Sequence, residues 1–183
     1  MVNALLKLLA TLLGILLLFI FPLLESFQRQ DEISTMYVMK STHQFVDAVR
    51  DKGVVTPEMW NRFAMEIELT GNMFDVDMIH YEKKYDPVYE DPVQQNTFKS
   101  DFLVHYRLNN KALIMKTLFP YLAQPIDAPN RRYKLKIGDY FSVTVKNTNR
   151  TQATVLLDWL SQSFAPTEKI VVPVGGLVRN EDY

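Results

Sequence analysis

Carboxylates and histidines are the side chains of this sequence that could do chemistry, and their tightest grouping is Asp75, Asp77 and His80. Two carboxylates beside an imidazole are ligands that attract a cation. In an extended strand, however, Asp75 and Asp77 point to one face and His80 points to the other. Calcium needs about six to eight oxygen ligands, which is more than this segment offers. We therefore expect an ordinary strand here and no metal site.

The sequence lacks the motifs that reveal an enzyme. It contains no Cys, which excludes thiol nucleophiles, Fe–S clusters and Cys-ligated zinc. It contains no G-x-S-x-G elbow, no glycine-rich phosphate loop, no dinucleotide turn and no H-E-x-x-H zinc motif. His43, His80 and His105 are not at the spacing of metal ligands. We therefore expect neither catalysis nor a cofactor.

The charges of the chain are balanced, with 20 basic and 21 acidic residues and a net charge of -1. Because binding to phosphate backbones needs an excess of Lys and Arg, nucleic acid is not an expected partner. One local row of basic residues, Arg132, Lys134 and Lys136, shares a face of a predicted strand. Such a row is typical of a solvated face, and an anion site is the less favoured alternative.

The elements that must position these side chains begin with an apolar run from Ala4 to Leu24, in which Lys7 is the only charge. A helix of this length is about 30 Å long, the thickness of the hydrocarbon core of a bilayer. The run ends without an A-x-A-like cleavage site, so we predict a retained membrane anchor and not a cleaved signal peptide. Lys7 lies near the end of the span, where its ammonium can reach the interface.

The flanks of this run and the pattern after it divide the chain. The short N-terminal flank is positive, which predicts that residues from about Glu25 onward lie outside the cytoplasm. From Glu25 to Asp51 there is neither Gly nor Pro, so we expect the anchor to continue into an amphipathic helix. We predict a membrane anchor (1–28), a helical neck (29–52) and an extracytoplasmic head (53–183) with an α+β fold, a mainly antiparallel sheet and packed helices.

Three residues of the N-terminal helix have a predicted structural effect. Gly14 offers a smooth surface for the approach of another helix. Pro22 should kink the helix, because its ring clashes with the preceding turn. Phe27 is the first residue of an apolar stripe that continues through Met36, Tyr37, Phe45, Val46 and Val49.

Local signals predict the elements of the head. Thr56 is an expected N-cap and Pro57 the first residue of a helix that ends at Gly71. Residues 74–81 alternate with period two and predict a strand. The other expected elements are an exposed loop (83–97), a strand (102–106), a helix from Asn110, a loop with Pro120, Pro125 and Pro129, a helix capped by Thr148 or Asn149, a strand (169–174) and a turn at Gly175-Gly176.

The clearest strand signal, from Tyr133 to Asn147, predicts a β-hairpin. A three-residue loop, Gly138 to Tyr140, pairs Ile137 with Phe141 and would bury two apolar rows together: Tyr133, Leu135 and Ile137 with Phe141, Val143 and Val145. We therefore expect Gly138 or Asp139 to adopt the left-handed conformation in this turn.

At its N-terminal end the chain resembles the type IV pilin superfamily, which includes pseudopilins and Tad-type pilin-like proteins. The resemblance rests on the apolar helix with Gly14 and Pro22, LLGILLLFIFP, which continues into an amphipathic stretch before a sheet-bearing head. It covers about the first 50 residues in detail. Four later segments, 29–33, 45–56, 70–76 and 138–147, also look like uncharacterised prepilin-like proteins of Gram-positive bacteria.

The chain departs from the pilin pattern at two places. Pilins usually carry a short basic leader that a membrane peptidase removes, and here Met1 stands immediately before the apolar run. Pilins also usually place a Glu near the mature amino terminus, and Leu5 occupies that place. Two interpretations therefore stay open: a minor subunit without this Glu, whose leader is missing from this sequence, or a protein that does not polymerise as a pilin.

Two functional hypotheses follow from these observations. The resemblance implies a structural subunit, major or minor, of a type IV-like or Tad-like filament, with membrane lipid and other copies or pilin-like subunits as its partners. The alternative is a single-pass anchored module whose head binds an extracytoplasmic ligand outside any filament. In both, the protein is located at the cell membrane with its C-terminal domain outside, or in an extracellular filament.

Overall fold

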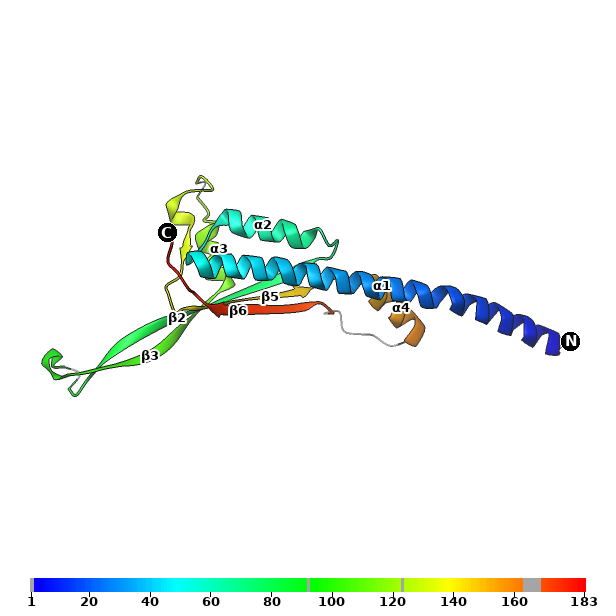
Figure 1. The fold of residues 1–183 in the computed structure, drawn as a ribbon, viewed down its shortest axis with the longest axis horizontal. Helices are drawn as coiled ribbons and strands as arrows, with labels where there is room; N and C mark the ends of the chain where they lie inside the picture. The colour runs from blue at the N-terminus through cyan, green and yellow to red at the C-terminus, as the bar shows by residue number, and fades with distance from the viewer. Residues whose placement is uncertain (1, 92, 123, 163–168) are drawn as a thin grey trace.

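The computed structural model describes residues 2–91, 93–122, 124–162 and 169–183. One helix, α1 (Val2–Lys52), forms a long rod, and the other elements gather around its C-terminal half (Figure 1). Those elements are β1 (Val54–Val55), α2 (Pro57–Glu68), β2 (Phe74–Tyr89), η1 (Gln95–Thr97), β3 (Phe98–Asn110), α3 (Lys111–Leu118), η2 (Pro129–Arg131), β4 (Tyr133–Lys134), β5 (Tyr140–Asn147), α4 (Gln152–Ser161) and β6 (Val171–Leu177).

The two halves of α1 have different surroundings. Residues 3–19 are all exposed, whereas from Asp31 onward the helix buries a residue about every third or fourth position. Val38, Val46 and Val49 are completely buried. The helix runs without a break through Pro22, so the predicted continuation of the apolar run into an amphipathic helix is confirmed.

The first buried residue of α1 is acidic and joins the helix to the C-terminal part of the head. The Asp31 carboxylate accepts a hydrogen bond from the Thr151 hydroxyl (2.8 Å) and lies 2.9 Å from the Lys169 ammonium. Thr151 is also the N-cap of α4, where its oxygen accepts from the Thr154 backbone amide. Asp31 therefore ties the midpoint of α1 to the start of α4.

The main sheet is antiparallel, with the strand order β3-β2-β5-β6, and a short second sheet pairs β1 with β4. Helix α1 lies across one face of the main sheet, and α2 packs on α1 from the side away from the sheet (Figure 1). Phe45 of α1 joins these layers: its ring stacks on Phe63 of α2 at 4.6 Å and meets Phe141 of β5 edge-on at 6.3 Å. This architecture confirms the predicted α+β class and the antiparallel sheet.

The predicted starts of α2 and α3 are confirmed. The Thr56 hydroxyl caps α2 by accepting a hydrogen bond from the Met59 amide (3.2 Å), and Pro57 occupies the first helical position. The Asn110 side chain caps α3 in the same way, accepting from the Leu113 amide (3.2 Å).

The exposed loop expected over residues 83–97 is wrong for its first half, because β2 continues as far as Tyr89 and pairs with β3. Beyond Tyr81, which is opposite Tyr140, β2 has no partner on its β5 side. Pro87 lacks a backbone N–H, and a strand with one free edge tolerates that loss. The two Asp-Pro pairs therefore mark a protruding strand and its tip.

The predicted hairpin of residues 133–147 is also wrong, although most of its burial pattern is correct. Strand β4 pairs with β1 instead of β5, and β5 lies between β2 and β6. Tyr133 and Leu135 are buried, but Ile137 is 60% exposed. Gly138 does adopt a positive φ of 85°, as expected for a turn. The turn closes with a hydrogen bond from the Asp139 amide to the Lys136 carbonyl oxygen (3.0 Å).

Two further expectations near the C-terminus are corrected. The cap of α4 is Thr151 and not Thr148 or Asn149; the Asn149 side chain accepts from the Met73 amide instead. Gly175-Gly176 is not a turn, because β6 continues through it. A Cβ on Gly176 would lie 2.5 Å from Cζ of Arg50, so glycine permits the close approach of α1 to this edge strand.

Candidate functional site

The apolar half of α1 is the first candidate site. Of the helices that the structure describes, only this one is long and apolar enough to cross a membrane, and none of its apolar window is buried. Leu5 is 70% exposed, and a Cβ added to Gly14 would meet nothing within 4 Å. Lys7 and Pro22 are exposed as well, whereas Phe27 is half-buried where the helix reaches the head.

This half of α1 cannot remain in water at low cost. Its leucines are exposed on all sides of the helix, including Leu8 (70%), Leu12 (60%) and Leu18 (74%). Burying one such side chain is worth about 1.5–3 kcal/mol. By length and composition the segment is therefore consistent with a single membrane span.

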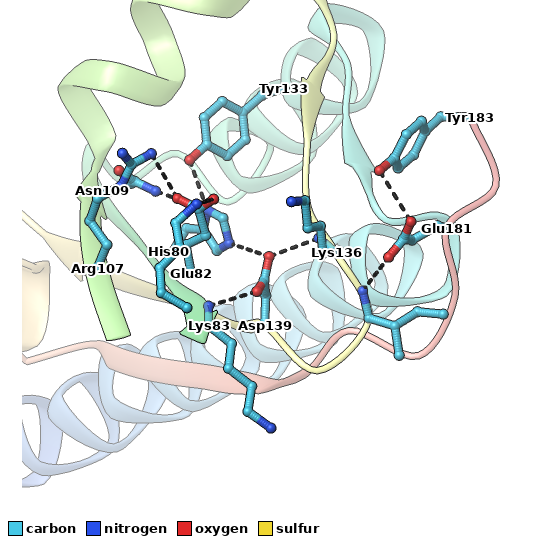
Figure 2. A network of polar contacts seen from close by, with 12 residues as sticks. His80, Glu82, Lys83, Arg107, Asn109, Tyr133, Lys136, Asp139, Glu181 and Tyr183 are labelled. Carbon is cyan, nitrogen blue, oxygen red and sulfur yellow. Dashed lines mark hydrogen bonds and ion pairs between the residues drawn. The ribbon is translucent and has the colours of Figure 1, made fainter. Parts of the chain in front are cut away.

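The second candidate site is a polar cleft of about 430 Å³ in the head, at the opposite end of the molecule from the N-terminus. Its centre is His80 of β2, whose ring is 2% exposed and lies between two partners (Figure 2). Nδ1 is 2.7 Å from the Tyr133 hydroxyl and Nε2 is 2.9 Å from Oδ2 of Asp139. Asn109 of β3 completes the surroundings, with its amide nitrogen 3.4 Å from Nδ1.

The hydrogen bonds limit where the protons of this group can lie. A carboxylate only accepts, so His80 donates its Nε2–H to Asp139; when the ring is neutral, Nδ1 accepts from the Tyr133 hydroxyl. Burial, followed by the negative charge of Glu82, raises the pKa of Tyr133 to about 12. Tyr133 therefore stays neutral as a hydrogen-bond donor throughout the physiological pH range.

Asp139 has a larger part than the turn position predicted for it. It is 1% exposed, and its Oδ1 accepts from the Lys83 amide (2.8 Å) while Oδ2 accepts from the Lys136 amide (2.7 Å). Together with the bond from His80, these contacts fasten the 136–139 turn to β2. The turn residue Gly138 permits this path with its positive φ, and of the two predicted turn residues Asp139 lines the cleft.

Charged side chains line the mouth of the cleft. The Glu82 carboxylate forms ion pairs with Arg107 (2.7 Å) and Lys84 (2.5 Å). Burial raises the pKa of Glu82, but the hydrogen bond from Lys84 and the charges of Arg107 and Lys84 lower it by more, so its net pKa lies below the ordinary value. The predicted basic row, Arg132, Lys134 and Lys136, is exposed and lines the same cleft.

The arrangement has two consequences for chemistry. The His80–Asp139–Tyr133 group is internally satisfied, which suits a structural link between β2, β3 and the 136–139 turn. The basic row gives the cleft three exposed cations that suit an anionic group, whereas Arg107 is paired with Glu82. Among the residues that the structure describes, no three His, Cys, Asp or Glu side chains are grouped to hold a metal ion.

Sequence reasoning did not bring these residues together. His80 is 59 residues from Asp139 and 53 residues from Tyr133, and no local pattern links such distant positions. One signal was present: His80 shares the core-facing side of its strand with Val76 and Met78. A histidine on a buried face needs partners. The residues predicted on α1, Leu5 to Phe27, lie far from this cleft (Figure 1).

Comparison with known proteins assigns no family to these features. No protein-family model matches the chain, and neither the curated proteins nor the solved structures contain a match to it.

Proposed function

We propose that this protein is a pilin-like structural subunit, major or minor, of a type IV-like or Tad-like surface filament, with its head outside the cytoplasm. The observation that carries the proposal is the contrast within one unbroken helix: residues 3–19 are exposed on every side, whereas residues 31–49 are the central helix of a folded head. The apolar half is therefore an element that something outside this chain must cover.

The rigid junction between the two halves favours assembly. No loop separates the apolar half of α1 from the head, because one helix runs through both. Any packing among the apolar halves therefore also sets the position of each head relative to its neighbours. In the membrane, lipid covers this half; in a filament, the same half of other copies covers it.

The charge distribution along α1 is consistent with transfer between lipid and a helical bundle. Between Lys7 and Glu25 the helix carries no charged side chain, so its insertion among other apolar helices leaves no buried charge to compensate. Gly14 and Ala10 are small residues four positions apart on one face, which permits close approach of a second helix.

The test compares two substitutions in the full-length protein. Gly14→Leu fills the smooth face and should reduce filaments in the material sheared from cells, while membrane insertion is unchanged because Leu is apolar. Leu12→Phe, which adds bulk on another face, is the matched control and should leave filaments unchanged. Two results together contradict the proposal. The full-length protein is a monodisperse monomer in detergent, and cells yield neither filaments nor pilin-like partners.

A second candidate function, an anchored binding module, is favoured by the basic row in the cleft. Removal of residues 1–28 discriminates between the two functions. A soluble head that retains the full activity of the protein supports the binding module, because a filament subunit cannot assemble without its apolar helix.

A further inference from the structure

The long β2–β3 hairpin forms an arm, which we define as residues 82–108. Beyond Tyr81 the hairpin leaves the main sheet, since β5 begins at Tyr140 and pairs no further along β2. Figure 1 shows the arm extending away from the head at the end opposite the N-terminus of α1. At its root the arm still contacts the head, because Glu82 and Arg107 line the cleft and the Lys83 amide donates to Asp139, whereas Tyr85, Phe102 and most of the residues beyond them are exposed.

The register gives the arm two unlike faces. Directly opposed residues in a hairpin share a face, and successive residues alternate. One face, which we call the apolar face, carries the pairs Lys83–Tyr106, Tyr85–Val104, Pro87–Phe102 and Tyr89–Phe98, and it continues to Tyr81–Leu108 at the root. The other face carries charged pairs, among them Glu82–Arg107 at 2.7 Å, and Asp86 there lies 3.2 Å from His105.

Most of the apolar face is exposed, although Tyr81 and Tyr89 at its two ends are half-buried. Tyr85 is 56% exposed, Phe102 52%, Tyr106 52% and Leu108 57%. Its rings contact one another, as Phe98 and Phe102 do at 5.4 Å. A continuous exposed apolar patch of this kind marks an interaction surface, and a two-stranded ribbon gains stability when one face is covered.

We propose that the apolar face of the arm packs against the same face of a second copy of this chain. This inference rests on the proposed function, which brings many copies together. The chemistry favours a copy: the only charged residue on the face is Lys83, whose ammonium lies 5.0 Å from the centre of the Tyr85 ring. Two such faces meet in a symmetric contact without burying a charged pair.

The membrane is not the occupant, because the arm lies at the end of the molecule away from the apolar helix.

The size of the arm explains why the contact needs the helices. About eight residues per strand at about 3.4 Å each, across two strands about 4.8 Å apart, give about 300 Å² per copy, or about 600 Å² in total. A stable interface buries about 1,200 Å² or more. The arm contact alone is therefore weak, and it becomes effective when packed α1 helices hold the copies at high local concentration.

Because the chain has no Cys, single cysteines test the contact in the full-length protein in its membrane. Val104→Cys lies on the apolar face, and the neighbouring Leu103→Cys, also exposed, lies on the charged face. With a short bismaleimide, Val104→Cys should form dimers about tenfold more efficiently than Leu103→Cys, because alternate side chains point to opposite faces. Adding Phe102→Asp to Val104→Cys should abolish the dimer, since a buried carboxylate opposes the contact.

A third cysteine, Leu13→Cys in α1, reports helix packing separately. If position 13 crosslinks but Val104→Cys gives no more dimer than Leu103→Cys, the arm contact is overturned and the filament proposal stands. Absence of crosslinks at all three positions overturns both. Capture of a different protein by Val104→Cys, without the homodimer, also overturns the arm contact.

Discussion

Replacing Asp139 by Asn tests whether the buried carboxylate links the 136–139 turn to the sheet. The two oxygens of Asp139 accept from three donors: the Lys83 amide, the Lys136 amide and His80 Nε2. An Asn side chain has one acceptor oxygen and one NH₂ group, so in either orientation an NH₂ faces at least one of these donors. The orientation that retains the oxygen at Oδ2 leaves the Lys83 amide without an acceptor.

The expected loss follows from these contacts. A buried donor without a partner costs about 1–3 kcal/mol, and hydrogen bonds to a charged acceptor are worth about 1.5–3 kcal/mol instead of about 1 kcal/mol. Asp139 is 1% exposed, so water does not replace the missing acceptor. We therefore expect Asp139→Asn to lower the free energy of unfolding by about 2–4 kcal/mol, which for a chain of this size corresponds to a fall in Tm of about 5–15 °C.

The assay is thermal unfolding of the full-length protein in detergent, followed by circular dichroism. Asp77→Asn is the matched control, because Asp77 is an exposed carboxylate on the outer face of the same sheet; such surface changes stay within about 0.5 kcal/mol. Asp139→Ala, which leaves all three donors unpaired, should be the least stable of the three. An Asp139→Asn protein whose Tm equals that of the control refutes the reasoning.

Two further predictions concern the backbone and pH. Gly53→Ala should destabilise the head more than Gly71→Ala. Both glycines have a positive φ, but only at Gly53 would an added Cβ lie 2.5 Å from a backbone oxygen, that of Asn180. Equal urea midpoints for the two variants would contradict this. Folding raises the pKa of Tyr133 from 10.0 to about 12. The protonated phenol therefore stabilises the fold fully below pH 10, and this stabilisation, at most about 3 kcal/mol, is lost as the pH rises from about 10 to about 12. Tyr133→Phe should therefore lose less stability than the wild type above pH 10, and parallel alkaline declines of the two proteins would count against the assignment.

Elements with local signals were predictable from the sequence. The Thr56 cap and the helix start at Asn110 are confirmed because a cap satisfies amides three residues away, within the same segment. The continuous α1 is confirmed for a similar reason, since helical periodicity is also local. These predictions needed no knowledge of the rest of the chain.

Strand pairing was not predictable in the same way. The burial of Tyr133, Leu135 and Phe141 agrees with the period-two pattern, yet β4 pairs with β1, which precedes it by about 80 residues. A strand exposes the same hydrogen-bonding groups to any neighbour, so alternation indicates which face is buried but not which strand lies beside it. The Gly175-Gly176 turn was wrong because β6 continues through both glycines, where Gly175 lies against Tyr140 of β5 and Gly176 against Arg50 of α1, two distant elements.

The sequence by itself determined that the chain has an apolar helix that continues into an antiparallel α+β head, because composition and periodicity are properties of contiguous residues. Only the tertiary structure decided that His80, Tyr133 and Asp139 meet, and that the β2–β3 arm presents one apolar face to solvent. The physical reason is that both features depend on register between segments far apart along the chain. Register is set by the packing of the whole head.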